Sequence, residues 1–230
     1  MKLSLNEETV ALYLKSIEDC YLKELPVNII SIEEDGYVLD RTIMHYEGGG
    51  QPGDRGQLLI GDNEVQIFNV IKRKNRIVHL AKEIVEGKEG ILRLDWERRY
   101  EIMKMHTLQH AISALLYDKH GIRTIKSEVY KGYGEIFLDK EIYNLEDDFY
   151  RINEMARDVK RYSIQKENLN ASLLKRCNLE RLPKSLTKVS IVEIDGIDKC
   201  ACAGTHVKNT SEIGKYWLRA MGKKLEFGKF

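Results

Sequence analysis

Two short motifs, each carrying histidine, constrain the fold of this chain more than any other feature. His106 and His110 stand four residues apart in a stretch with helical periodicity, and Cys202 and His206 stand four apart at a turn. Residues i and i+4 of an α-helix project from the same face, so one metal ion can contact both imidazoles. A thiolate and imidazoles together suit zinc. We therefore expect the fold to bring the helix and the turn together around one zinc ion.

The ligand set leaves two questions open at this stage. Cys200 lies two residues before Cys202 and competes with it for the ligand role, but alternate residues of a strand point to opposite sides. Four protein ligands close a tetrahedral zinc site, whereas catalytic zinc keeps one position for water. The sequence is compatible with four ligands bound at once, or with one histidine that gives way to water.

Length and composition are those of a globular protein. The chain has 230 residues, 43% of them hydrophobic and 32% charged, which is enough for one large core or two modest domains. No stretch approaches the ~20 apolar residues that span a bilayer, and acidic residues stand where a signal peptide needs an apolar core. Four cysteines form no disulfide-rich pattern. We expect a cytoplasmic protein with no membrane partner.

The first part of the chain has the texture of a β-rich domain. After a short helix expected over residues 6–16, apolar or alternating runs broken by turns predict strands over 27–32, 37–39, 42–46, 65–70, 77–80 and 90–94. The predicted fold class is α+β, with a small β-barrel-like domain over residues 1–95. An α+β zinc-binding domain, an antiparallel sheet with packed helices, is expected over residues 96–230.

Trp96 begins a long helical pattern that runs to about Leu116 and ends before Gly121. Its apolar residues recur at helical spacing on one side, while His106 and His110 lie on nearly the opposite side beside further apolar residues. A helix that is apolar on both sides is buried on both sides, so the histidines should face an interior layer or cleft. Beyond it we expect strands near 127–130, 135–138 and 189–194, helices over 148–165 and 166–181, and a final hairpin of 214–220 with 224–230.

Two further segments suggest a ligand. Residues 47–56 are rich in glycine, so their backbone can approach a ligand closely, although such a run is also typical of a plain hairpin connection. Residues 157–188 hold nine basic side chains against three acidic ones. A basic segment on a chain of net charge +1 favours a phosphate-binding face, and a solvated helix surface is the alternative.

The three motifs together resemble the editing portion of alanyl-tRNA synthetases and, more closely, the free-standing alanyl-tRNA editing proteins of the AlaX type in their medium-length form. The resemblance is carried by Glu47-Gly-Gly-Gly-Gln-Pro-Gly-Asp54, His106-Thr-Leu-Gln-His110 and Cys202-Ala-Gly-Thr-His206, in this order and spacing, and it covers roughly residues 20–230. The chain departs from the family pattern modestly at Gln109 and Ala203.

The resemblance implies hydrolysis of the ester that links serine, and also glycine, to the 3′ end of tRNA(Ala). It implies Zn²⁺ held by His106, His110, Cys202 and His206, with a water as the reactive group. Carried over by position, the substrate pocket would include Gly48, Gly49, Gly50 and Gln51, with Ser127 or Thr124 contacting the serine hydroxyl. Within the basic segment we expect Lys175 and Arg176 to contact tRNA phosphates, and no ATP or other nucleotide cofactor is expected.

Two alternatives remain. One is editing of another tRNA, as in the related domain of threonyl-tRNA synthetases, against which the glycine-rich loop argues. The other is a non-catalytic RNA-binding module with a closed, structural zinc. Position 107 is threonine, and no glutamate lies between the two histidines of the helix. The pattern of zinc peptidases is therefore absent, and peptidase activity is disfavoured.

Overall fold

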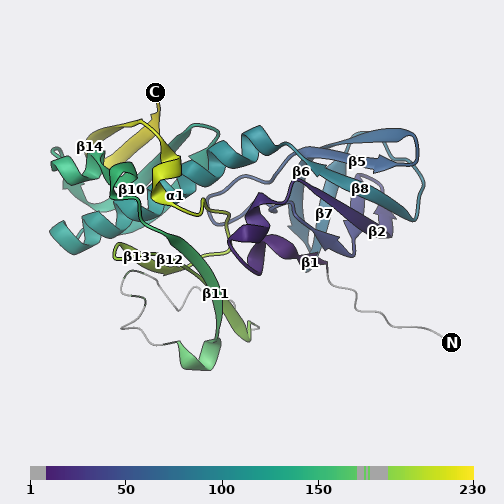
Figure 1. Ribbon diagram of the computed structural model, residues 1–230, viewed down its shortest axis with the longest axis horizontal. Helices are drawn as coiled ribbons and strands as arrows, with labels where there is room; N and C mark the ends of the chain where they lie inside the picture. Colours follow the sequence, from purple (N-terminus) through teal and green to yellow (C-terminus); the bar gives the residue numbers. More distant parts are fainter. Residues whose placement is uncertain (1–8, 170–173, 175, 177–185) are drawn as a thin grey trace.

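Six antiparallel strands close into a barrel at one end of the molecule (Figure 1). The computed structural model describes residues 9–169, 174, 176 and 186–230. In their order around the barrel the strands are β2 (Glu24–Glu33), β3 (Gly36–Leu39), β7 (Arg76–Ala81), β6 (Asn63–Arg73), β5 (Gly56–Ile60) and β8 (Glu89–Leu94). Alternate residues of β2 and β8, among them Val27 and Leu92, point into a common apolar core. Alongside the barrel, β1 (Val10–Ala11) pairs with β4 (Arg41–Thr42) and leads into the 3-10 turns η1 (Leu12–Leu14) and η2 (Glu18–Tyr21).

Helix α1 (Trp96–His120) follows the last barrel strand and runs through the remainder of the molecule (Figure 1). The Asp95 side chain caps its first turn by accepting a hydrogen bond from the backbone N–H of Arg98 (3.1 Å). Gly121 ends the helix in the left-handed conformation, which a residue without a Cβ adopts most readily. Most residues between the two caps are buried on every side of the helix, as the sequence predicts.

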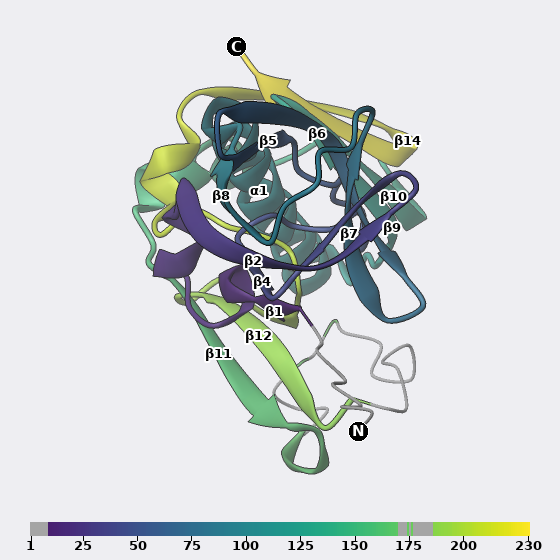
Figure 2. The same cartoon turned by 90° about the vertical axis from the view of Figure 1, so that its right-hand side faces the viewer.

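Two three-stranded sheets surround α1. One has the order β14 (Tyr216–Lys229), β10 (Tyr133–Ile142) and β9 (Thr124–Tyr130), and it packs its apolar face on α1. The other has the order β11 (Val159–Gln165), β12 (Lys188–Ile194) and β13 (Asp198–Ala201), and β11 with β12 forms a ribbon that extends from the body (Figure 2). Short 3-10 turns connect these strands: η3 (Asp147–Tyr150), η4 (Ile152–Met155), η5 (Lys166–Asn168) and η7 (Thr210–Ile213).

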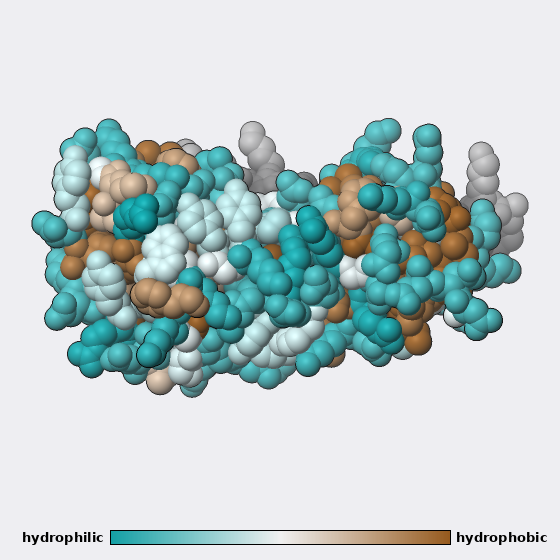
Figure 3. Space-filling model, turned by 90° about the horizontal axis from the view of Figure 1, so that it is seen from above, coloured by the Kyte–Doolittle hydropathy of each residue, from teal (hydrophilic) through white to brown (hydrophobic). Residues whose placement is uncertain are grey.

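The surface is mainly hydrophilic on the face that Figure 3 shows, with hydrophobic side chains gathered toward its two ends. Among the described residues, no helix combines the length and apolarity that a membrane crossing needs. The mixed composition of helix and sheet and the barrel itself are confirmed.

Several expected elements are wrong in detail. The helix expected over 148–165 is replaced by η3, η4 and β11, because buried and exposed side chains alternate along β11 once it pairs with β12. The helix expected over 6–16 is β1 and η1 where it is described, and β4 is shorter than the strand expected over 42–46. The helix expected over 166–181 lies mostly outside the described residues, and its start is η5. Strand β5 was not expected, and α1 is the one α-helix of the described residues.

The final hairpin expected over 214–220 with 224–230 is confirmed, although β14 is assigned continuously from Tyr216 to Lys229. Its two halves lie side by side, since Arg219 Nη1 is 3.8 Å from Glu226 Oε2 and Gly228 packs against the Trp217 ring. The chain reverses at Gly222, whose φ of 62° suits a tight turn, and the second half pairs with β10.

Candidate metal centre and its cavity

Four side chains from two distant segments converge beside α1. His106 and His110 project from the helix, and Cys202 and His206 belong to the turn that follows β13, which we call the metal turn (residues 201–206). The possible ligand atoms of these four residues all lie within 4.8 Å of one another. The Sγ atom of Cys202 is 3.3 Å from Nε2 of His206 and 3.7 Å from Nε2 of His106. A group of this size and composition matches what one tetrahedral zinc ion requires.

In each of the three histidines of this group, Nδ1 has a hydrogen-bond partner outside the cluster. Nδ1 lies 2.9 Å from Gln51 Oε1 in His106, 2.8 Å from Asp198 Oδ2 in His110, and 3.1 Å from Thr107 Oγ1 in His206. When each Nδ1–H donates to its oxygen, the lone pair of each Nε2 is left to face the cluster. Outer acceptors of this kind set the tautomer and the ring orientation of metal-binding histidines. The arrangement therefore presents three imidazole lone pairs and one thiol to a single point.

Gln51 connects the glycine-rich loop to both halves of the centre. Its Oε1 also accepts the backbone N–H of Thr205 (2.9 Å), and its Nε2 donates to Thr205 Oγ1 (2.9 Å). The side chain is buried and does not line the cavity described below. Gly204 lies so close to His106 and Gln51 that any Cβ at this position would overlap both side chains. The sequence predicts Gln51 in the pocket wall, whereas the structure places it behind the wall, hydrogen-bonded to His106 and Thr205.

A buried ion pair fixes the loop at its other end. The Arg99 guanidinium of α1 donates to both carboxylate oxygens of Asp54, and both side chains are almost completely buried. Asp54 Oδ2 also accepts the backbone N–H of His45 (2.5 Å), and Arg99 donates to the backbone oxygen of Ile43 (2.7 Å). Because a buried charge without a partner is strongly unfavourable, this pair holds the loop against the helix.

Gly50 explains why the loop needs glycine. Its φ is +83°, and a Cβ there would overlap the carbonyl of Ser127 in β9. Its own carbonyl accepts the N–H of Val129 (2.8 Å). The loop thus packs directly on β9, which carries Ser127 and Thr124.

The electrostatics of the centre favour metal binding. Burial alone would raise the pKa of the Cys202 thiol, but three adjacent imidazoles hold that pKa well below its usual range. Burial keeps the pKa of His206 well below 6.5. For His110, burial acts in the same direction but is outweighed by the Cys202 thiolate and the Asp198 carboxylate, which raise the pKa to about 9. A cation at this point would replace the proton of His110 and neutralise the thiolate.

A cavity of about 280 Å³ opens directly onto the centre. Its walls come from the glycine-rich loop, α1, β9 and the metal turn. Of the pocket residues expected from the sequence, Gly48, Gly49, Thr124 and Ser127 line it, whereas Gly50 and Gln51 stand behind the wall. Thr124 Oγ1 donates to Ser113 Oγ (2.8 Å), which also accepts from Gln109 Nε2 (2.9 Å). The remaining lining residues are His45, Tyr46, His106, Gln109, His110, Arg176 and residues 200–204.

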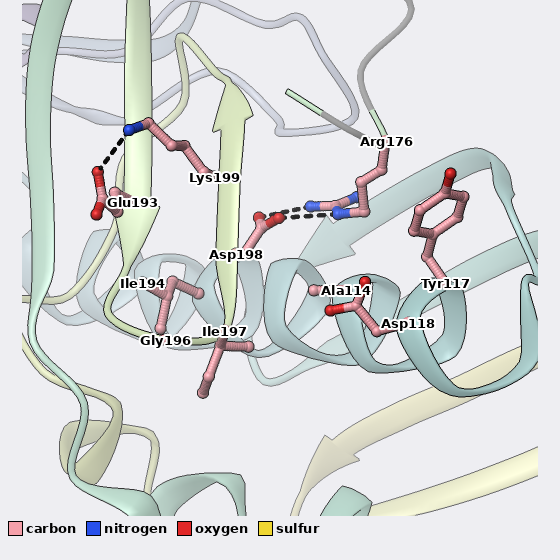
Figure 4. Close-up of a pocket in the computed structure, with 10 residues that line it drawn as sticks. All are labelled: Ala114, Tyr117, Asp118, Arg176, Glu193, Ile194, Gly196, Ile197, Asp198 and Lys199. Carbon is pink, nitrogen blue, oxygen red and sulfur yellow. Dashed lines mark hydrogen bonds and ion pairs between the residues drawn. The ribbon is translucent and has the colours of Figure 1, made fainter. Parts of the chain in front are cut away.

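Arg176 lines both the metal cavity and a neighbouring cavity of about 280 Å³, where it points toward Asp198 (Figure 4). Its Nε and Nη2 donate to the Asp198 carboxylate at 2.9 and 2.5 Å. Burial would raise the pKa of Asp198, but this guanidinium and His110 hold it at about 2. Contact of Arg176 with tRNA remains a prediction, and the expected contact of Lys175 lies outside the described residues. Cys200, the competing thiol, is disulfide-bonded and does not belong to the cluster.

Comparison with known proteins gives the family. The profile "Threonyl and Alanyl tRNA synthetase second additional domain" matches residues 189–218, which include the metal turn, and "tRNA synthetases class II (A)" matches residues 4–98. The alanyl-tRNA editing protein AlaX-M of Methanosarcina barkeri is 32% identical over 89% of this chain and 90% of its own length. The chain belongs to the alanyl-tRNA editing proteins.

Other relatives match over different shares of their length. AlaX-L of Pyrococcus horikoshii is 35% identical over 86% of this chain, which spans about half (51%) of that protein. The alanine–tRNA ligase of Ignicoccus hospitalis is 30% identical over 86% of this chain and 23% of its own length. The family expected from the three motifs is therefore confirmed.

Proposed function

We propose that this protein is a zinc-dependent hydrolase that removes serine, and also glycine, from mischarged tRNA(Ala). The observation that carries the proposal is the cluster of three imidazoles and one thiol, with every Nδ1 held by an outer acceptor, at the end of a cavity. The names of the relatives, alanyl-tRNA editing proteins, support the same substrate.

The residues of the centre divide into two groups by their contacts. His106, His110, Cys202 and His206 would hold the metal. Bound zinc would supply Lewis-acid polarisation of the ester and activation of water. Gln51, Asp198 and Thr107 keep the three imidazoles in the tautomer that leaves Nε2 free for the metal.

The far wall of the cavity has the chemistry to recognise a small hydroxylated side chain. Thr124, Ser127 and Gln109 bring hydroxyl and amide groups to that wall. A site that hydrogen-bonds a hydroxyl discriminates strongly against the analogue that lacks it, whereas exclusion of one methylene gives much less. Serine on tRNA(Ala) would therefore be hydrolysed while alanine is spared.

The domain arrangement that we propose follows the two cores. The barrel, residues 1–95, has its own apolar interior, and residues 96–230 form the editing domain around α1. The cytoplasmic location expected from the sequence is part of this proposal, in keeping with relatives that act in translation.

One feature favours a second function. Four protein ligands fill a tetrahedral zinc, so the same cluster is compatible with a structural zinc in an RNA-binding module that has no turnover. Metal removal separates the two functions, because chelation unfolds a domain that depends on structural zinc and leaves a catalytic domain largely folded.

The test is deacylation of Ser-tRNA(Ala), Gly-tRNA(Ala) and Ala-tRNA(Ala) by the purified protein, with and without a zinc chelator. We expect loss chiefly of serine, slower loss of glycine, which lacks the hydroxyl, and retention of alanine, with inhibition by the chelator and recovery on addition of zinc. Far-UV circular dichroism of the same samples reports the fold. A folded, zinc-loaded protein that hydrolyses none of the three esters would contradict the proposal and favour the binding module.

A further inference from the structure

A second cavity, of about 430 Å³, adjoins the metal cavity along the metal turn. It lies between the β6–β7 hairpin of the barrel and strand β12. Tyr46, Cys202 and Ala203 line both cavities, so a ligand in one can continue into the other over these residues. The volume is within the range of ligand-binding pockets, roughly 300–1,000 Å³. We call this second cavity the hairpin groove.

The charge of the hairpin groove is positive. Lys72 and Lys188 lie in its wall, both are exposed, and neither forms an ion pair within the described part of the chain. Among the residues that the structure describes, no aspartate or glutamate lines it. The cavity of Figure 4, which also adjoins the metal cavity, has three carboxylates in its wall, those of Asp118, Glu193 and Asp198. Its two cations, Arg176 and Lys199, are already paired with two of these carboxylates. A phosphate chain that leaves the metal cavity therefore finds unpaired positive charge in the hairpin groove and not in the other cavity.

An aromatic ring stands at the junction. The Tyr46 ring is stacked on the imidazole of His45, with centroids 5.6 Å apart and planes 6° from parallel. Lys72 Nζ lies 5.8 Å from the centroid of the Tyr46 ring. Aromatic platforms beside cationic side chains are the usual means of binding single-stranded nucleic acid, because every base has a face that stacks.

We propose that the hairpin groove binds the single-stranded 3′ end of the RNA whose terminal ester enters the metal cavity. This assignment rests on the proposed function. Lys72 and Lys188 contact the phosphates, and Tyr46 lies beneath a terminal base. The amino acid then points toward Thr124 and Ser127, at the opposite side of the metal from the RNA.

The test measures binding, not turnover. Fluorescence anisotropy would follow a labelled RNA hairpin with a single-stranded CCA end, and a blunt hairpin of the same duplex. We expect Lys72→Ala and Lys188→Ala each to weaken binding of the CCA hairpin about five- to tenfold and to reduce the salt slope by about one. Lys82→Ala, an exposed lysine just beyond the other end of β7, is the matched control and should bind like the wild type.

Two outcomes would overturn the assignment. Unchanged affinity in both variants means that the groove does not hold RNA, and equal losses on the blunt hairpin mean that it contacts the duplex. Deacylation of Ser-tRNA(Ala) is measured separately, and the lysine variants should raise KM and keep kcat. A wild type that binds the CCA hairpin through these lysines without hydrolysis contradicts the proposed function and leaves the groove assignment intact.

His45 carries a second, independent observation. It lines the metal cavity with 2% of its surface exposed, and its Nδ1 is buried without a hydrogen-bond partner among the described residues. Buried polar atoms are nearly always paired, so an unpaired one in a cavity wall marks a place that a ligand completes. Burial holds the pKa of His45 at about 4, so the ring is neutral and offers one donor and one acceptor.

We infer that His45 hydrogen-bonds the terminal ribose of the substrate. It adjoins Tyr46, the residue that both cavities share, and the ribose must lie between the ester and the rest of the RNA. His45→Phe should then lower kcat/KM for Ser-tRNA(Ala) about tenfold or more while the melting temperature stays equal or rises. His45→Gln, which restores a donor and an acceptor, should recover part of the activity. Full activity in His45→Phe, or a lower melting temperature in both variants, would overturn this role.

Discussion

His79 in the barrel and His110 in the metal centre are both buried imidazoles. Their hydrogen-bond partners differ in how far along the sequence they lie from the histidine. Nδ1 of His79 donates to the backbone oxygen of Tyr37 (3.2 Å), its neighbour on the adjacent strand, and Nε2 accepts from Thr42 (2.8 Å). Nδ1 of His110 instead contacts Asp198, which is 88 residues away. The barrel thus satisfies its buried polar groups by local strand pairing, whereas the metal centre depends on segments that meet only in the complete fold.

The largest expected effect is loss of a ligand. His206→Ala should abolish stoichiometric zinc binding and reduce deacylation of Ser-tRNA(Ala) by a factor of about 10³ or more, because in the proposed function the metal supplies the reactive group. Zinc content by atomic absorption and single-turnover kinetics measure the two effects. His120→Ala, at the half-buried last residue of the same helix and outside the cluster, is the control and should keep both. Full zinc content in His206→Ala would exclude it as a ligand.

Loss of an outer acceptor should have a smaller effect. Asp198→Ala and Gln51→Ala should each weaken zinc affinity about 10- to 100-fold, because the imidazoles lose the bond that sets their tautomer. Competition with a chromophoric chelator measures the affinity without reference to activity. Asp195→Ala, an exposed carboxylate three residues before Asp198, should leave it unchanged. Equal affinity in all three variants would show that these contacts do not support the metal.

The free energy of unfolding of the protein should depend on pH because the barrel buries His79. Burial lowers the pKa of His79 to about 4, below the 6.5 of an exposed imidazole. Its contribution to stability is therefore present above pH 6.5 and is lost as the pH falls toward 4, because only the unfolded chain binds the proton. For one such group the free energy of unfolding should fall by roughly 2 kcal/mol between pH 7 and pH 5. Urea unfolding at both pH values measures it, and His79→Gln should flatten the dependence.

The smallest effect is expected at Arg176. This side chain reaches the metal only through Asp198, so Arg176→Gln should weaken zinc affinity a few-fold at most. Two of its nitrogens are already occupied by this carboxylate. If Arg176 also contacts tRNA, the same variant will lower RNA affinity and its salt dependence. RNA binding equal to that of the wild type would restrict its role to the metal centre.

Local patterns made much of the fold predictable. Alternation of apolar residues in β2, β6 and β8 reflects a barrel with one buried face, and the spacing of His106 and His110 follows from the geometry of one helix. The capping residues Asp95 and Gly121 lie at the ends of that helix. In each case the signal and its cause lie within a few residues of the sequence.

What could not be predicted depends on pairing between distant segments. Residues 159–165 are a strand because β12 is available to pair with them. The roles of Gln51 and Thr107 have no local signal, since their partners are 55 and 99 residues away. The position of His45 in the cavity wall also has no local signal, because such a position becomes visible only when the cavity exists.

The contacts of Gln51 limit how the chain could be divided. A single amide joins a loop of the barrel, an imidazole of α1 and the backbone of the metal turn. A fragment that begins at residue 96 would therefore contain all four residues of the cluster and lack the acceptor of His106. Any chain that keeps the helix and the turn but lacks this loop must provide His106 with an acceptor from elsewhere.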